Sequence, residues 1–558
     1  MLEYRRAPGL SRLLPVALVA AACAAAPPCD RLLVGGVVEL PDGAVRREIA
    51  ITGGRIVALV PPDQSRRWRR AAAEVVELAG AHVYPGFTDS HGHLTGYGAA
   101  LEVVDLRGTA SLAEVVERAR AGAAGRPAGS WVAGRGWDQN LWPGRAMPHH
   151  AALSAALPDH PAVLRRVDGH AVLTNARGLA LAGIAASTPD PPGGRILRDE
   201  RGEPTGVLVD TAADLLDRLL PPPDEAELER LVVGGARALA AVGLTEIHDA
   251  GTGRMQLAVL RRLQAEGRLP IRVYAMLDGA DSALLDAEFA GGPRVSGDGM
   301  LAVRAVKLFA DGALGSRGAL LAAPYSDEPS TRGLAVTAEA PLAALIRRTA
   351  AASFQPCIHA IGDAAVTRSL DLFEREIGSG VAVRPRIEHS QVIRPDDVAR
   401  FAALGVLAAV QPTHCTSDMP WAPERLGPER TAWAYRWRSL LAANARLALG
   451  SDVPVESPDP RLGLWAAVTR RPPEGTGHAG WNLPEALTLP EAIAGYTTWA
   501  AWAGFEEDWR GAIAPGYAAD LTIFDRALAE ADPAGILQAR IVRTVVAGRD
   551  AYVAGSEP

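Results

Sequence analysis

The middle of the chain repeats one pattern eight times, a short apolar segment followed by a longer stretch with apolar residues every three or four positions. The short segments have the composition of buried strands, and the longer stretches, such as 225–242, 255–266, 342–352 and 364–373, have the periodicity of helices. Eight such units close into a barrel rather than an open sheet. The pattern therefore predicts an α/β fold of the (β/α)8 barrel (TIM barrel) type, with strands within residues 82–91, 244–251, 271–277, 303–312, 355–363, 385–391, 406–414 and 446–452.

The connection between the first and second predicted strands is far longer than the others. About 150 residues separate them, whereas a strand-to-helix loop in such folds has about 2–6. This connection contains strand patterns of its own, SWVAGRGW, AVLRRVDGHAVL and TGVLVD, and proline-rich breaks at 189–192 and 221–223. We therefore predict a large inserted subdomain, about residues 100–224, over the mouth of the barrel, where active sites of this fold lie.

Short strand patterns with glycine turns occur at both ends of the chain, within residues 31–59 and 520–553. Two β-rich segments that flank one long central region predict a small β-sandwich assembled from both termini. An arginine-rich stretch, 63–70, is expected to be an exposed loop. The predicted domains are a signal segment (1–29), the two sandwich parts (30–84 and 511–558) and the barrel (85–510).

The first 29 residues have the organisation of an export signal. Three arginines form a positive start, and residues 13–22 form an apolar stretch too short to be a membrane span. The motif AAAC, which ends at Cys23, resembles a bacterial lipoprotein signal in which Cys23 would carry lipid. The alternative is an ordinary signal peptide that is cut after its small residues. We expect an exported protein of a bacterium, periplasmic or membrane-anchored, with no further membrane span.

Composition narrows the range of partners. The formal net charge is −7 over 558 residues, and neither a basic stripe for nucleic acid nor an acidic tail is present in the sequence. We expect the protein to bind a small-molecule substrate and no nucleic acid. We expect it to contact the membrane only through the N-terminal lipid. Whether identical subunits assemble stays open. Four cysteines are too few for a disulfide framework. Cys357 and Cys415 are expected to be small buried residues.

Side chains that can bind metals gather where the predicted strands end. The first strand ends in His91-Gly92-His93, and residues two apart on a strand point the same way, about 6.6 Å apart, so both imidazoles can reach one ion. A lone histidine is more often a hydrogen-bonded structural residue, which is the default interpretation of His248. Together with the first pair, the ends of further strands predict a metal site at the carboxyl-terminal face of the barrel, with His359, His389, Asp452 and Lys307.

Several long motifs are similar to those of a known family. The segment PGFTDSHGHL resembles the metal-binding signature that opens the barrel in the amidohydrolase superfamily. VKLFADGALGSRGA, IHAIGD, RIEHSQ and LGSDVPVES resemble amidohydrolase family 3, the YtcJ-like group that includes N-substituted formamide deformylases. So do GRGWDQNLW and DPPGGRILRDERGEPTGVL in the insertion and GAIAPGYAADLTIFD near the end. The likeness covers nearly everything from Leu32 to Val553.

The resemblance implies a site with two divalent metal ions. One ion would be bound by His91, His93 and Asp452, and the other by His359 and His389. The histidine-rich ligand set favours zinc.

The resemblance also implies that Lys307 bridges the two ions as a carboxylated lysine. An ammonium group has no lone pair and cannot bind a metal, whereas addition of carbon dioxide gives an anionic carbamate with two oxygens. The alternative is an unmodified lysine paired with an acid such as Asp311, which leaves a site for one metal. Asp452 would be the catalytic residue that orients the attacking water, takes its proton and passes it to the leaving group.

Five further residues are candidates for contacts with the substrate. Trp137, Asp138 and His170 lie in the insertion, and His414 follows the seventh strand. Arg317, in the loop after the fourth strand, is expected to meet a substrate carboxylate. For each of the five, packing or hydrogen bonding within the fold is the alternative.

The expected activity is metal-assisted hydrolysis of an amide-type C–N bond other than a peptide bond. A lactonase or a metal-assisted isomerase on the same scaffold is the second interpretation. The third is a surface lipoprotein that keeps the fold only for binding. The presence of every expected metal ligand, Asp452 included, argues against this last interpretation.

Overall fold

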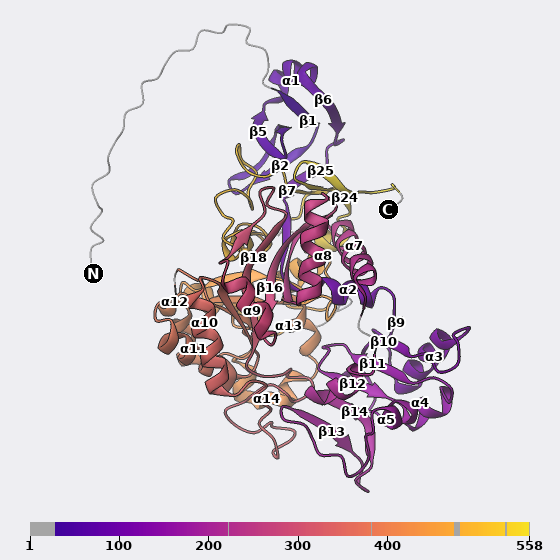
Figure 1. Ribbon diagram of the computed structural model, residues 1–558. Coiled ribbons are helices and arrows are strands. Elements are labelled where there is room, and N and C mark those ends of the chain that lie inside the picture. The colour runs from indigo at the N-terminus through magenta and orange to yellow at the C-terminus, as the bar shows by residue number, and fades with distance from the viewer. Residues whose placement is uncertain (1–27, 221–222, 381, 474–479, 530–532, 557–558) are drawn as a thin grey trace, which may run out of the picture.

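The molecule has three parts, which follow one another in space (Figure 1). Two terminal β-sheets lie at one end, the barrel lies in the middle, and the inserted subdomain lies at the other end. Cys23 and residues 1–27 of the predicted export signal (1–29) lie outside the described residues, whereas its last two residues, Pro28 and Cys29, are described and Cys29 begins the first strand. The computed structural model describes residues 28–220, 223–380, 382–473, 480–529 and 533–556.

The barrel is a sheet of eight parallel strands, as the sequence pattern predicts. Strands that are consecutive in the pattern are neighbours in the sheet, and a parallel bridge between Gly92 and Val453 brings the end of the last strand to the first. The backbone N–H of Asp452 also donates to the carbonyl of His91 (2.7 Å). The strands are β8 (Phe87–Gly92), β15 (Leu244–Thr252), β16 (Arg272–Asp278), β18 (Leu301–Phe309), β19 (Gln355–Ala360), β20 (Arg386–His389), β21 (Leu407–Val410) and β22 (Arg446–Leu449), with β17 (Arg294–Val295) antiparallel to β18.

Amphipathic helices cover the barrel, and the four predicted from periodicity are confirmed. The α7 helix begins where the Asp224 side chain accepts a hydrogen bond from the N–H of Glu227, and its first turn is acidic, which suits the positive end of a helix. Its apolar residues, such as Leu231 and Val232, are buried. The helices of this part are α2 (Leu94–Ala100), α7 (Glu225–Ala241), α8 (Arg254–Ala265), α9 (Ser282–Phe289), α10 (Glu339–Ala351), α11 (Asp363–Glu376), α12 (Val398–Leu404), α13 (Pro412–Asp418), α14 (Ala422–Thr431), α15 (Trp437–Ala442), α16 (Pro460–Thr469), α17 (Leu489–Tyr496) and α18 (Thr498–Ala503).

Helices α2 and α7 pack closely because glycine stands at their contact. A methyl group on Gly98 would lie 2.1 Å from the carbonyl oxygen of Leu231. We expect Gly98→Ala to lower the free energy of unfolding by about 1–3 kcal/mol, as overpacking does, in a chemical denaturation experiment. Gly234→Ala in α7 is the matched control, because a Cβ there meets nothing within 4 Å and alanine favours a helix by about 1 kcal/mol. Equal stability of Gly98→Ala and the wild type would contradict the close contact.

Charged and polar side chains fill the barrel interior below the predicted metal site. The fully buried Arg386 donates to Glu388 (Nε–Oε1 2.8 Å) and to Nδ1 of His248 (3.0 Å). The Tyr274 hydroxyl donates to Gln355 (2.9 Å) in the same region. His248 is therefore hydrogen-bonded inside the barrel, as the structural interpretation of this histidine expects.

The insertion forms a six-stranded sheet with a hydrophobic core of its own. Its strand order is β13-β14-β12-β11-β10-β9, and its three predicted strand patterns are confirmed. A hydrogen bond from Arg425 of helix α14 to Asn140 (Nη2–Oδ1 3.0 Å) ties it to the barrel part. The elements are β9 (Val104–Asp105), α3 (Leu112–Ala123), β10 (Val132–Trp137), α4 (Ala151–Ala156), β11 (Ala162–Arg166), β12 (Ala171–Thr174), α5 (Ala176–Leu181), β13 (Gly194–Arg198), β14 (Pro204–Asp210) and α6 (Asp214–Asp217).

Strands from both ends of the chain share one six-stranded sheet in the order β25-β24-β23-β7-β2-β3. A second sheet, β5-β4-β1-β6, contributes to the same hydrophobic core. An ion pair between Arg272 and Asp520 (2.7 Å) joins this part to the barrel. The elements are β1 (Cys29–Val34), β2 (Val37–Leu40), β3 (Gly43–Arg46), β4 (Glu48–Thr52), β5 (Arg55–Val60), β6 (Ala72–Glu77), β7 (His82–Pro85), β23 (Leu521–Phe524), α19 (Pro533–Gln538), β24 (Ile541–Val546) and β25 (Arg549–Val553).

Two details differ from the sequence prediction. The predicted strand 82–91 is two strands, β7 in the terminal sheet and β8 in the barrel, which separate at Gly86, where a Cβ would lie 2.4 Å from the Thr245 hydroxyl oxygen. The predicted loop 63–70 is wrong, because it contains the helix α1 (Ser65–Ala71). This helix buries Trp68 and leaves its arginines exposed, so one aromatic residue anchors an otherwise polar segment.

Cys357 and Cys415 are buried, which confirms the prediction for both residues. Across the described residues, every helix falls short of the length and apolar character that crossing a bilayer requires.

Candidate metal centre

The predicted metal ligands lie at the carboxyl-terminal ends of barrel strands, although they are far apart in the sequence. Parallel strands bring these ends to one face of the barrel. The residues come from β8 (His91), the start of α2 (His93), the end of β18 (Lys307), β19 (His359), β20 (His389) and the turn after β22 (Asp452).

Asp452 lies at the centre of the first group. Its Oδ1 is 3.1 Å from Nε2 of His93 and 3.5 Å from Nε2 of His91. The other ring nitrogens are held elsewhere: Nδ1 of His91 donates to Glu388 (2.5 Å), and Nδ1 of His93 donates to the carbonyl of Ala250 (2.7 Å). Both Nε2 atoms therefore direct a lone pair toward the carboxylate, which is the tautomer that metal binding requires.

His359 and His389 lie beside this group. Their ring centroids are 4.5 Å apart, and the His389 ring is 4.9 Å from that of His91. Nδ1 of His389 is 2.9 Å from Oε1 of Gln411, which leaves Nε2 of His389 directed elsewhere. Two sets of three have ligand atoms that all lie within 4.8 Å of one another: His91, His93 and Asp452, and His389, His414 and Asp452.

His414, which the sequence suggests as a substrate contact, therefore lies next to the metal ligands themselves. Its Nε2 is 3.8 Å from Oδ2 of Asp452, and this buried nitrogen has no hydrogen-bond partner among the described residues. Its place directly after the seventh strand is the sequence signal that marks it, because every other ligand also follows or ends a strand.

Lys307 is buried among the ligands. Its Nζ lies 3.1 Å from Nε2 of His91. Asp311, the alternative partner, instead accepts backbone N–H groups of Leu320, Ile361 and Gly362. An ion pair between Lys307 and Asp311 is thus not formed.

Burial sets the charge states of the histidines. Loss of solvent lowers the pKa of His91 to about 4, with the Lys307 charge as a second cause, and it holds the pKa of His359 and His389 well below the usual range. Burial acts in the opposite direction on Asp452, but the neighbouring His93, His91 and His389 outweigh it and hold the pKa of the carboxyl group well below its usual range. The centre therefore offers neutral imidazoles and a carboxylate at neutral pH, a donor set that fits a divalent cation.

The turn that carries Asp452 is held by the first strand. The Asp89 carboxylate accepts the backbone N–H of Ser451 (3.0 Å) and that of His91 (3.1 Å). Asp452 has φ +60° and His389 has φ +72°, a backbone region that is costly for non-glycine residues. The Asp89 contacts hold the turn of Asp452 in place, and the bond to Gln411 holds the ring of His389.

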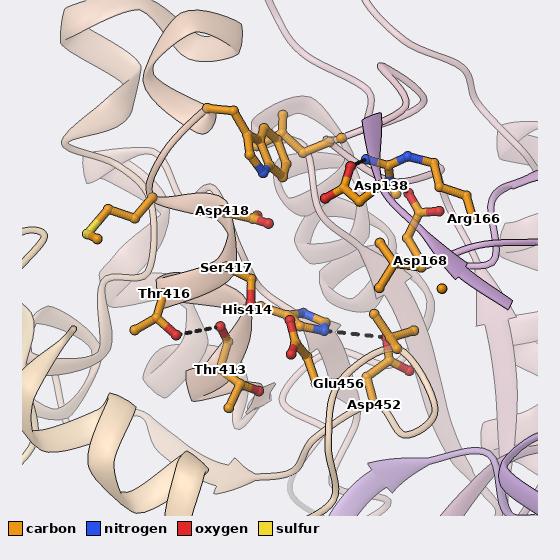
Figure 2. A pocket seen from close by; sticks show the side chains of 18 of the residues that line it. Asp138, Arg166, Asp168, Thr413, His414, Thr416, Ser417, Asp418, Asp452 and Glu456 are labelled. Carbon is orange, nitrogen blue, oxygen red and sulfur yellow. Dashed lines mark hydrogen bonds and ion pairs between the residues drawn. The ribbon is translucent and has the colours of Figure 1, made fainter. Parts of the chain in front are cut away.

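A cavity of about 520 Å³ opens onto the centre, and a second of about 530 Å³ shares His170, His359, His389 and Asp452 with it. Figure 2 shows His414, Asp452 and Glu456 on the barrel side of the first cavity and Asp138, Arg166 and Asp168 facing them from the insertion. Apolar side chains complete the wall: Leu141, Leu314, Met419, Trp421, Val455 and Leu462.

Three of the five predicted substrate residues, Asp138, His170 and His414, line this cavity. Trp137 does not: it is fully buried in the core of the insertion, and its indole N–H donates to the carbonyl of Leu164. Arg317 is also absent from the lining of both cavities, and it pairs with Asp327 (3.0 Å). A local acid neutralises this arginine, which sequence spacing alone does not reveal.

His170 reaches the centre from the insertion. Its ring lies 5.4 Å from that of His359, and its Nδ1 bonds to Asp210 (2.7 Å). Burial works against the charged form, but the Asp210 carboxylate outweighs it and raises the pKa of His170 to about 9. A protonated imidazole beside the metal ligands can donate a hydrogen bond to a polar group in the cavity.

Glu388 is a functional candidate that the sequence analysis does not single out, although it directly precedes His389. It binds His91 on one side and Arg386 on the other, and all three are buried. We expect Glu388→Gln to weaken metal binding by about 10–100-fold, because a partner that orients a ligand is lost. We also expect a loss of about 3–5 kcal/mol in the free energy of unfolding, because Arg386 remains buried without its partner.

Chelator competition and chemical denaturation measure these two effects. Glu200→Gln, at an exposed position of the insertion, is the matched control and should change neither. If the metal affinity of Glu388→Gln equals that of the wild type, Glu388 does not support metal binding at the centre.

Known proteins with the same sequence pattern and fold were found for nearly the whole chain. The pattern of the amidohydrolase family matches residues 74–552. YtcJ of Bacillus subtilis is 34% identical over 487 residues, covering 86% of this chain and 90% of its own. The N-substituted formamide deformylase of Arthrobacter pascens is 28% identical over 546 residues, covering 93% and 97%.

A crystal structure of an uncharacterized metal-dependent hydrolase from Pyrococcus horikoshii has the same fold. Its TM-score is 0.72 at 30% identity, and the match covers 90% of this chain and 98% of the other. Because the family pattern and these matches cover most of the chain, this protein is a hydrolase that belongs to the amidohydrolase family.

Proposed function

We propose that this enzyme hydrolyses an amide-type C–N bond, other than a peptide bond, in a small molecule. The observation that carries the proposal is the convergence of Nε2 of His91 and His93 on the carboxylate of Asp452, which lines both cavities. The similarity to an N-substituted formamide deformylase supports an amide rather than an ester as the substrate.

The proposed cofactor is a pair of divalent ions, with zinc favoured by the imidazole ligands. His91, His93 and Asp452 would hold one ion and His359 and His389 the other, with Lys307 bridging them as a carbamate. One feature of the whole chain supports the carbamate: of its 57 lysines and arginines, Lys307 is the only lysine. Arginine serves every other cationic position, but its guanidinium stays protonated and cannot add carbon dioxide as an amine does.

The residues around the centre have separate roles in the proposed reaction. A divalent ion at this site supplies a Lewis acid that lowers the pKa of water and polarises a carbonyl oxygen. Asp452 orients the attacking water, accepts its proton at a carboxylate oxygen and delivers that proton to the leaving nitrogen. Glu388 and the carbonyl of Ala250 hold His91 and His93 in the ligand tautomer.

Metal analysis and a turnover assay test the proposal. The purified chain, supplied with zinc, is expected to hold about two ions and to release amine from N-substituted formamides, acyl-amino acids or cyclic amides. His91→Asn should lose both metal and turnover, whereas His149→Asn, at an exposed position, should keep both. Fewer than about one ion per chain, together with no turnover of any of these amides, would overturn the proposal.

We also propose that the chain is exported in a bacterium and anchored by lipid on Cys23. The support is the sequence that precedes Cys23. The protein should fractionate with membranes and yield a lipid-modified amino-terminal peptide by mass spectrometry, and Cys23→Ser should release it. A mature chain that begins at a residue other than Cys23 and carries no lipid would contradict the anchor and indicate an ordinary signal peptide.

A further inference from the structure

Four arginines line the two cavities at the metal centre, and three of them are paired with carboxylates. Arg107 pairs with Asp105 (2.8 Å) and Arg166 with Asp138 (2.6 Å). Arg165 pairs with Asp217. Arg135, on β10, is the exception: within the described ranges its guanidinium forms no ion pair.

The contacts of Arg135 leave part of its hydrogen-bonding capacity unused. Nη2 donates to the carbonyl of Val167 (3.1 Å), while Nε is buried and has no partner among the described residues. Burial lowers the pKa of Arg135 to about 10, although the charges of Asp452 and Asp168 act in the opposite direction. The side chain therefore remains a cation at neutral pH, and among the described residues no carboxylate lies within ion-pair distance of it.

The guanidinium lies in the cavity that reaches the predicted metal ligands. It shares its cavity with His93, Lys307 and Asp452, and it extends over Gly169, whose Cβ would lie 3.4 Å from Nη2. An unpaired buried charge is costly, and a planar guanidinium binds a carboxylate through two parallel hydrogen bonds. An anion on the substrate would satisfy Arg135 while the scissile bond lies at the metal ligands.

The other cavity disfavours the same anion. It is lined by Asp138, Asp168, Asp418, Asp452 and Glu456, and its one buried guanidinium, that of Arg166, already bonds to two of them. The cavity of Arg135 also has carboxylates, Asp168, Asp217, Asp249 and Asp452, but Asp217 pairs with Arg165, and Arg135 and Lys307 add two further cations. The two cavities thus differ in charge, which gives an anionic substrate one orientation across the centre.

We propose that Arg135 binds a carboxylate of the substrate, so that the enzyme selects amides that carry a carboxylate group over neutral amides. This inference rests on the proposed amide hydrolysis. It assigns to Arg135, in the insertion, the role that the sequence suggests for Arg317, whose charge Asp327 already neutralises.

Two matched pairs of formamides test the proposal on the zinc-loaded enzyme. N-formylglycine is compared with N-methylformamide, and racemic N-formylphenylalanine with N-formyl-2-phenylethylamine, so each pair differs by the carboxylate. We expect kcat/KM to favour the carboxylate member of at least one pair by about 10–100-fold, the range for hydrogen bonds to a charged group. Arg135→Gln should abolish this preference, because kcat/KM falls for the carboxylate member of the pair, whereas Arg135→Lys should retain part of it.

Arg201→Gln, at an exposed turn of the insertion, is the control and should match the wild type. Calorimetric titration with N-formylphenylalanine and with inorganic phosphate provides a readout that does not depend on turnover. If N-formylphenylalanine binds and Arg135→Gln weakens this binding, the proposal is supported even when no formamide is hydrolysed. The absence of hydrolysis would then count only against the proposed function. Three results would overturn the proposal. They are equal kcat/KM within both pairs, no binding of N-formylphenylalanine, and binding that depends on Arg135 for phosphate but not for the carboxylate.

Discussion

Asp452→Asn is expected to lower kcat by about 10²–10⁴-fold, the usual contribution of a general acid–base group. The amide of asparagine retains the size of the side chain and one oxygen, but it cannot accept the proton of the attacking water. Because His91 and His93 stay in place, at least one metal ion per chain should remain bound. Steady-state kinetics and metal analysis on the same preparation measure both effects.

Asp508→Asn is the matched control, since Asp508 is exposed and lies away from both cavities. It should retain full activity and metal content. A value of kcat for Asp452→Asn within tenfold of the wild type would assign the proton transfer to another group. His170, which approaches the centre from the insertion, would then be the next candidate.

Lys307→Arg is expected to reduce bound metal from about two ions to about one and to abolish turnover. Arginine keeps the positive charge but cannot form the bridging carbamate, and its larger head group must fit beside His91, where Lys307 Nζ lies at 3.1 Å. Lys307→Met tests the same point without a charge. Both variants should lose the second ion if the carbamate bridges the pair.

The single lysine makes a direct observation of the carbamate feasible. With ¹³C-labelled carbon dioxide, the wild-type enzyme should show a side-chain carbamate resonance that Lys307→Met lacks, because no second lysine is available to form one. Arg304→Met, a change on the same strand at a half-buried position away from both cavities, is the control and should keep the resonance. A wild-type protein with two ions and no such signal would contradict the carbamate.

Much of the fold could be predicted because it depends on local patterns. Apolar segments of strand length that alternate with helical periodicity predict a (β/α)8 barrel, and a connection of about 150 residues predicts an insertion. The same logic brought His91, His359 and His389 to one face, since the ends of parallel strands meet there. It failed at residues 63–70, where one buried tryptophan converts an apparently polar loop into a helix.

The partners of individual side chains could not be predicted in this way. Arg317 and Arg135 have the same chemistry in sequence, yet one meets Asp327 and the other meets no carboxylate of the described residues. Glu388 and Trp137 show the same limit, because their contacts with His91 and Leu164 depend on packing in three dimensions.

The sequence by itself therefore determined the eight-unit barrel and the strand ends that carry the metal-binding side chains, because hydrophobic periodicity and the position of a residue on a strand are local properties. Only the tertiary structure decided which charges are neutralised, that His414 lies within reach of the metal ligands, and that Arg135 lines the cavity without an ion-pair partner among the described residues. The physical reason is that ion pairing and burial depend on distances between segments that are remote along the chain, and folding alone sets those distances.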